Sequence, residues 1–131
     1  MRQLLIATLC ALIFVGCGET VHSKHYTSHF KLSSPIALHV DSWDPDSIRT
    51  LFEKNGYTID TQSVLHVSLS TDPIISSCPV GASPALKEHF VRISILLGDV
   101  EHYRIQLNQK EPITLKDIEK VIVRMKREVG D

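Results

Sequence analysis

This sequence of 131 residues lacks the features that define several large classes of protein. Its 14 basic and 15 acidic residues give a formal net charge of −1, so no excess of positive charge favours nucleic acid as a partner. Three cysteines are too few for a disulfide framework. No catalytic motif is present, and we predict a protein that is not an enzyme and needs no cofactor. The composition is that of one globular domain.

The longest apolar run lies at the N-terminus and is too short to span a membrane. After Met1-Arg2-Gln3, residues 4–15 (LLIATLCALIFV) are apolar without interruption, and Gly16-Cys17 follows. A membrane-spanning helix needs about 20 such residues, whereas a shorter run behind a basic start is typical of a signal peptide. We therefore assign residues 1–16 to a signal peptide.

The last residues of this segment, together with Cys17, form a recognisable motif. Phe14-Val15-Gly16-Cys17 resembles the lipobox of bacterial lipoproteins, with Phe14 where Leu is usual. The resemblance implies that Cys17 is lipidated and becomes the new N-terminus. Two or three acyl chains anchor a protein stably without a spanning helix. Gly18, rather than Asp, resembles the pattern of lipoproteins that are anchored in the outer membrane and face the periplasm; the inner membrane and the cell surface are the alternatives.

A polar segment follows Cys17. Residues 17–29 have no apolar periodicity, and we predict that they form a lipidated tether that keeps the domain within roughly 40 Å of the membrane. The tether contains His22, His25 and His29. Neutral imidazoles are ligands for Zn²⁺ and Cu²⁺, so this spacing permits a metal site. The alternative is a plain polar spacer.

Residues 30–131 predict one α+β domain, a mostly antiparallel sheet with two helices on one face in the order β-α-β-β-β-α. Apolar alternation indicates strands, and a cap before an apolar stripe indicates a helix. The expected elements are strands at 30–32 and 36–40, a helix between Asp44-Pro45 and Gly56, strands at 64–70, 90–97 and 101–107, and a helix from Thr114 to Gly130. His39, His66 and His102 fall on the sheet face opposite the core. Trp43 is interpreted as a core residue, and the alternative is an exposed aromatic that recognises a partner.

The register of the hairpin can be predicted from its apolar residues. A two-residue turn at Gly98-Asp99 would set Ile93 opposite Arg104. A three-residue loop over 98–100 instead sets Ile93 opposite Ile105 and Ile95 opposite Tyr103, which puts the apolar residues on one face. We predict the three-residue loop.

Two segments are candidates for contact with a partner. Residues 71–88 form a long connection with three prolines, which either docks a partner or folds over the sheet as a lid. On the last helix a basic face either meets anionic lipid or an acidic partner, or is simply solvated. The candidate partner-binding residues are Ile74, Ile75, Cys78 and Val80 in the connection and Lys120, Arg124 and Arg127 on the helix.

These observations predict a lipoprotein anchored in the outer membrane that acts as a non-enzymatic accessory or assembly factor of an envelope complex. The order of the elements is similar to that of small accessory lipoproteins of the envelope. The partners expected are the membrane, through the lipid anchor, and an unidentified envelope protein. The alternative is a metal-binding or metal-sensing lipoprotein that uses the tether histidines. A hydrolase, or a redox enzyme that uses Cys78, is the third hypothesis.

Overall fold

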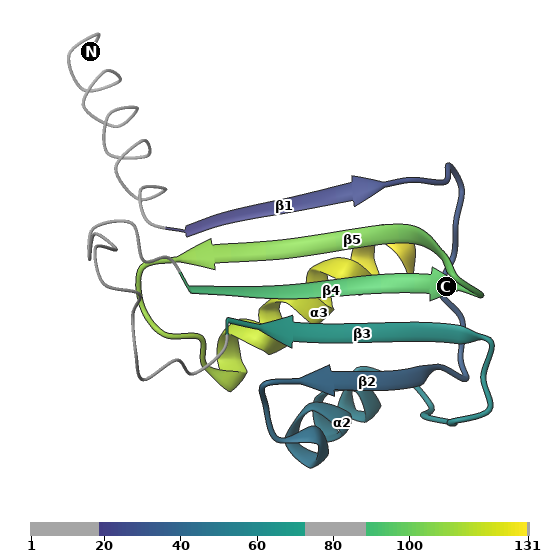
Figure 1. Ribbon diagram of the computed structural model, residues 1–131, viewed down its shortest axis with the longest axis horizontal. Helices are drawn as coiled ribbons and strands as arrows, with labels where there is room; N and C mark the ends of the chain where they lie inside the picture. Colours follow the sequence, from purple (N-terminus) through teal and green to yellow (C-terminus); the bar gives the residue numbers. More distant parts are fainter. Residues whose placement is uncertain (1–18, 73–88, 131) are drawn as a thin grey trace, which may run out of the picture.

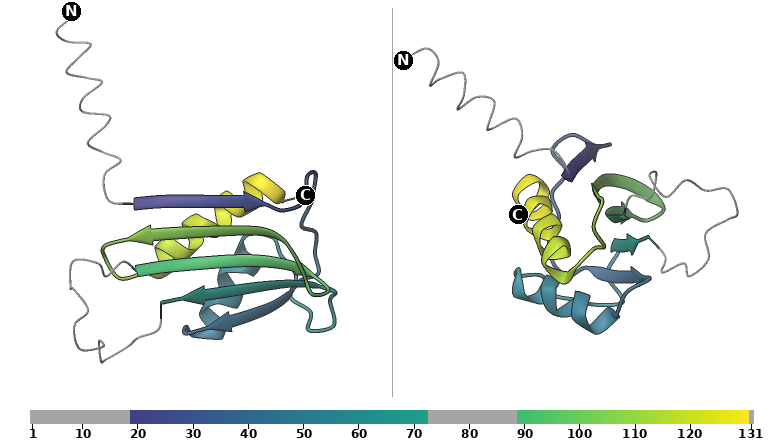
Figure 2. Two further views of the ribbon diagram at one scale, coloured as in Figure 1. Left: turned by 45° about the horizontal axis from the view of Figure 1, so that its top comes forward. Right: turned by 90° about the vertical axis from the view of Figure 1, so that its left-hand side faces the viewer.

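The computed structural model describes residues 19–72 and 89–130. These residues form one mixed sheet with the strand order β1-β5-β4-β3-β2 and two helices that cover the same face of it (Figures 1 and 2). The elements are, in chain order, β1 (Glu19–His25), β2 (Ala37–Asp41), α2 (Pro45–Lys54), β3 (Leu65–Thr71), β4 (His89–Leu97), β5 (Val100–Gln109) and α3 (Leu115–Val129). The predicted α+β class with a mostly antiparallel sheet is confirmed.

The order of elements needs one correction, because β1 was not expected. Residues 19–25, assigned above to a tether, pair antiparallel with β5, with Glu19 opposite Gln109 and His25 opposite Tyr103. Val21 lies opposite the buried Leu107 and packs against the core. The predicted tether is therefore wrong for these residues, and the described domain begins at Glu19 rather than at residue 30.

The expected strand over residues 30–32 is also absent from the described residues. The backbone N–H of Leu32 donates to the carbonyl of Val129 at 2.7 Å, which forms an isolated bridge beside the end of α3. Leu32 is almost fully buried. The segment thus serves as a packed connection between β1 and β2.

The helix α2 connects two parallel strands, β2 and β3, which pair with Ala37 opposite His66. Pro45 is its first residue, and Gly56 follows its end with φ +94°, a left-handed conformation that glycine adopts without strain. Asp44 occupies the N-cap position as expected. Its carboxylate does not cap the helix but accepts a hydrogen bond from Ser47 Oγ at 2.7 Å, and this contact lowers the pKa of Asp44.

The predicted cap of the last helix is confirmed. Thr114 Oγ1 accepts from the backbone N–H of Asp117, and the Asp117 carboxylate accepts from the backbone N–H of Thr114 at 2.9 Å. Such a reciprocal pair satisfies two backbone donors at the start of a helix. The expected apolar stripe is buried, apart from Leu115, and consists of Ile118, Val121, Ile122, Met125 and Val129.

The hairpin has the predicted pairs but a different turn. Ile93 lies opposite Ile105 and Ile95 opposite Tyr103, yet Leu97 pairs with Val100, so the turn contains two residues. A β-bulge next to Ile95 absorbs the extra residue of β5 and restores the register that buries the apolar face. Gly98 has φ +63°, which suits the first central residue of a type II′ turn.

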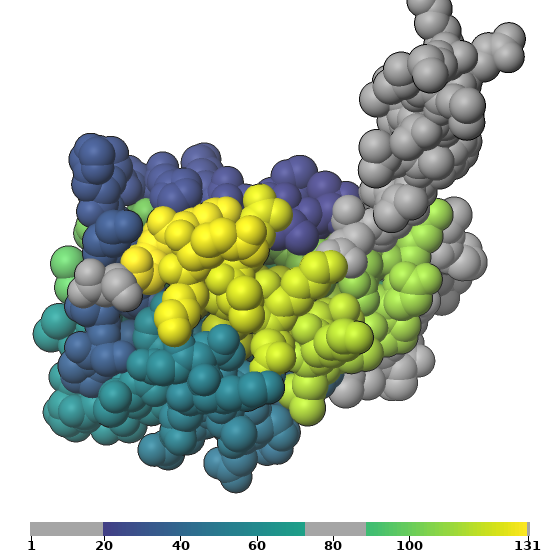
Figure 3. Space-filling model, turned by 180° about the vertical axis from the view of Figure 1, so that it is seen from behind, coloured from purple at the N-terminus to yellow at the C-terminus, as the bar shows by residue number. Residues whose placement is uncertain are grey.

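The core lies between the sheet and the helices. Alternate residues of β3, β4 and β5 point into it, and α3 and α2 lie side by side over that face (Figure 3). Trp43 is half-buried and packs against this core. The fully buried side chains include Ile48, Phe52, Leu69, Ile93, Ile95, Tyr103, Ile105, Leu107, Ile118 and Ile122. Each such aliphatic or Phe side chain contributes about 1.5–3 kcal/mol through burial.

Candidate functional site

Several residues singled out in the sequence lie outside the described residues. They are the lipidation candidate Cys17 and the loop residues Ile74, Ile75, Cys78 and Val80. The two ends of that loop, Asp72 and His89, are joined by a contact of 2.7 Å between Asp72 Oδ2 and His89 Nδ1. Docking by the loop stays a prediction.

The three histidines of the predicted tether do not converge on one point. His22 and His25 are three residues apart on β1, and side chains at that spacing point to opposite faces of a strand. His25 packs edge-on against the Tyr103 ring at 5.0 Å, whereas His22 lines a depression on the other face. Within residues 19–72 and 89–130, no three His, Cys, Asp or Glu side chains are placed to hold a metal ion.

The basic face of α3 is interrupted by acidic side chains. Arg124 pairs with Glu128 at 3.1 Å through its Nε atom. Burial acts to raise the pKa of Asp117, but hydrogen bonds from Thr114 and Gln109 and the charge of Lys120 lower it overall. A shallow depression on this face is lined by Lys116, Asp117, Glu119, Lys120, Val123 and Arg127. The surface is therefore of mixed charge rather than a continuous basic ridge.

A cluster at the junction of β1, β5 and α3 fixes the unexpected strand. The hydroxyl of Tyr103, a fully buried residue, donates to Glu128 Oε1 at 2.9 Å. Burial and the negative charge of Glu128 raise the pKa of Tyr103. Burial acts to raise the pKa of Glu128 as well, but hydrogen bonds involving Ser23, Arg124 and Tyr103 lower it overall. Ser23 thus ties β1 to α3 through a shared carboxylate.

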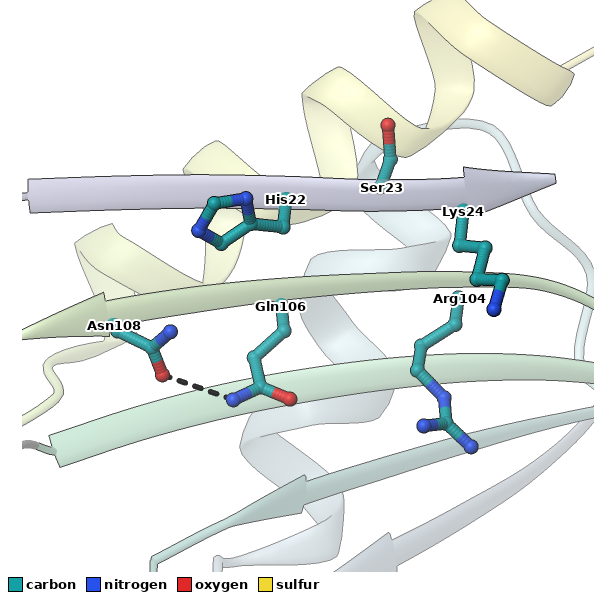
Figure 4. A pocket seen from close by; sticks show the side chains of 6 residues that line it. All are labelled: His22, Ser23, Lys24, Arg104, Gln106 and Asn108. Carbon is teal, nitrogen blue, oxygen red and sulfur yellow. Dashed lines mark hydrogen bonds between the residues drawn. The ribbon is translucent and has the colours of Figure 1, made fainter.

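The sheet face without helices is polar. Next to β1 it has a depression of about 380 Å³ lined by His22, Ser23, Lys24, Arg104, Gln106 and Asn108, which come from two neighbouring strands (Figure 4).

Hydrogen bonds order the side chains of this face. Gln106 accepts from Arg92 Nε at 2.7 Å and donates to Asn108 Oδ1 at 2.9 Å. Arg104 donates two hydrogen bonds to Glu101. The face thus presents amide and guanidinium groups that are already held in place.

The opposite half of this face carries a pair of histidines. His39 Nε2 lies 2.8 Å from His66 Nδ1, and the two rings meet end to end, with centroids 5.1 Å apart and planes 15° apart. Their placement on the face away from the core was predicted, but their contact was not. It arises because β2 and β3 are parallel, with His39 opposite Ser68 and therefore diagonal to His66.

Exposed apolar side chains gather at one end of the sheet. Val64 precedes β3, and Leu97 and Val100 flank the turn of the hairpin; the three residues are 68%, 41% and 60% exposed. We call them the distal rim, because they lie at the end of the sheet opposite the start of β1 (Figure 1). Exposed apolar groups of this kind mark interaction sites when they cluster.

Comparisons with known proteins give no family. No family model matches the chain, and no curated protein matches it. The solved structures similar to it include two of PelC dodecamers from Paraburkholderia phytofirmans. One, of a single-residue variant, has a TM-score of 0.47 at 10% identity and covers 85% of this chain and 96% of that one. The other has a TM-score of 0.48 at 11% identity and covers 82% and 95%. Similarity at this level does not indicate a function for the chain.

Proposed function

We propose that this chain is a lipoprotein anchored in the outer membrane through Cys17, and that its domain is a non-enzymatic accessory or assembly factor of an envelope complex. The apolar run over residues 4–15 and the Phe14-Val15-Gly16-Cys17 tetrad support the anchor. Among the residues that the structure describes, no helix has the length and apolar character needed to cross a bilayer.

The start of β1 determines how the domain sits relative to the anchor. β1 begins at Glu19, two residues after Cys17. Two residues of extended chain span at most about 7 Å. In this proposal the end of the sheet where β1 begins therefore rests at the headgroup surface, instead of lying at the end of a long tether.

The exposed apolar side chains of the distal rim are the observation that supports a protein partner. The ten residues of β5 run from Val100 to the end at which β1 begins, which places the rim about 30 Å from the anchored end. In our proposal the strands stand upright on the membrane, and apolar groups at that distance then do not reach the bilayer to which the domain is attached. Their occupant in this proposal is an apolar surface of a periplasm-facing envelope protein.

Site-specific photocrosslinking in the native bacterium tests the partner. A benzophenone amino acid at Val100 should give one discrete adduct with an envelope protein, identified by mass spectrometry, and Leu97→Asp should abolish it. The same probe at Lys110, an exposed residue at the anchored end, is the matched control. An adduct of twice the monomer mass would show a second copy instead, and equal adducts from both positions would refute a role for the rim.

Labelling with an alkyne fatty acid tests the anchor separately. The wild-type chain should incorporate the label and Cys17→Ala should not, because the lipobox pattern assigns the acyl chain to this thiol. Label retained by the variant would refute the lipoprotein assignment. The crosslinking result would still test the protein partner, because it does not depend on the anchor.

A further inference from the structure

We propose that His39 and His66 form a binding site for a divalent copper ion on the sheet face that has no helices. The observation is the 2.8 Å separation of His39 Nε2 and His66 Nδ1, on rings that meet end to end with their planes 15° apart. Both residues are on paired strands, so the backbone holds the two imidazoles in register. This proposal is independent of the lipid anchor and of the three histidines in residues 17–29.

The pair has the chemistry that a copper site needs. Each neutral imidazole has one lone pair and one N–H, and in the empty pair one proton lies between the two facing nitrogens. When both nitrogens bind a metal ion, the ring that donated this proton takes it at its other nitrogen. No proton is gained or lost overall, and each ring then offers a lone pair to the ion. Imidazole nitrogen is a ligand that Cu²⁺ prefers.

The two nitrogens are close enough to bind one ion. Two neighbouring nitrogens about 2.0 Å from a tetragonal ion, at roughly 90° to each other, lie about 2.8 Å apart. Around tetrahedral zinc, with bonds of about 2.0–2.1 Å, the corresponding separation is about 3.3–3.4 Å. In the empty pair the observed 2.8 Å is the length of an N–H···N hydrogen bond, and the centroid separation of 5.1 Å means that the rings meet end to end. Both rings must therefore turn before their lone pairs converge on one ion, and the preference for Cu²⁺ over Zn²⁺ rests on the higher affinity of Cu²⁺ for nitrogen ligands.

The site is open on one side. His39 is exposed and His66 is half-buried, so an ion reaches the pair directly from solvent. Within the described parts of the chain, no third His, Cys, Asp or Glu joins the pair to complete a metal cluster. Water or a small external ligand therefore fills the other coordination positions, which makes this an exchangeable site rather than a closed structural one.

Copper titration of the full chain in detergent micelles, purified without a histidine tag, tests the proposal. The probe is Cu²⁺ alone at pH 7.5, and the readout is the electron paramagnetic resonance spectrum together with the affinity. We expect one Cu²⁺ with two equatorial imidazole nitrogens. His39→Gln and His66→Gln should each reduce this to one nitrogen and weaken binding about tenfold or more.

His22→Gln is the matched control, because it removes an exposed histidine on the same face of the sheet. It should leave both the nitrogen count and the affinity unchanged. Zn²⁺ should compete less well than Cu²⁺ in wild type. The proposal is overturned if His39→Gln keeps a two-nitrogen spectrum, or if His22→Gln weakens binding as much as the substitutions in the pair. Circular dichroism on each variant verifies that the fold is retained.

Discussion

Replacing Glu128 by Ala should destabilise the domain by about 2–3 kcal/mol. The carboxylate accepts from the Tyr103 hydroxyl at 2.9 Å and from Arg124 Nε at 3.1 Å. Hydrogen bonds to a charged group contribute about 1.5–3 kcal/mol, and a buried donor left without an acceptor costs about 1–3 kcal/mol. Tyr103 is fully buried in the folded domain, so its hydroxyl would lose the acceptor that satisfies it. The loss should appear in the free energy of unfolding from urea melts.

A double-mutant cycle separates the buried hydroxyl from the other contacts. In a Tyr103→Phe background no hydroxyl is left to satisfy, so Glu128→Ala should cost only about 1 kcal/mol. Glu119→Ala is the matched control on the same helix. Its partner Lys54 is largely exposed and bonds it at 3.1 Å, and surface pairs contribute about 0–1 kcal/mol. If Glu128→Ala costs as much with Phe at position 103 as with Tyr, the hydroxyl is not what the carboxylate stabilises.

Three further predictions concern stability. Contacts in the fold lower the pKa of Glu128 from its usual 4.5, so the ionised carboxylate contributes fully to the free energy of unfolding above about pH 4.5. This contribution is lost as the pH falls through the folded pKa, and the stabilities of wild type and Glu128→Gln should therefore converge in urea melts at acid pH. Ile122→Asp, at a fully buried position, should cost more than about 3 kcal/mol, and Val123→Asp, 44% exposed, less than about 0.5 kcal/mol; equal melts would mean that α3 packs differently. Gly98→Ala should cost about 1 kcal/mol through its φ of +63° alone, because nothing lies within 4 Å of the added Cβ; no thermal shift would contradict the turn geometry.

The parts of the fold that were predicted correctly are those that a local pattern specifies. Helix α3 was placed because its apolar stripe repeats over four turns and because Thr114, with Asp117 three residues later, has the spacing of a capping box. The pairs of the hairpin were predicted because a slip of one residue would expose a whole apolar face. The length of the turn was not predicted, because a β-bulge beside Ile95 allows a two-residue turn at Gly98 and still keeps the apolar residues on one face.

The parts that were missed depend on distant residues. β1 has one apolar residue pointing inward, Val21, and its strand is defined by backbone pairing with β5 and by the carboxylate of Glu128. No periodicity within residues 19–25 shows this. The contact of His39 with His66 likewise depends on the parallel pairing of β2 with β3. The sequence placed both rings on one face but not beside each other.

The pairing of β1 with β5 also constrains when the sheet can be completed. Among the described residues β1 is the first strand and β5 the last, and they pair with Glu19 opposite Gln109. Their pairing therefore closes a chain loop that contains nearly the whole domain. Contacts so distant along the chain slow folding, because the entropy of loop closure is lost before the pairing is gained. A chain exported in an unfolded state, as our proposal requires, would therefore carry its membrane-proximal strand unpaired until β5 has crossed. If the chain is exported as we propose, the topology itself would delay folding during translocation.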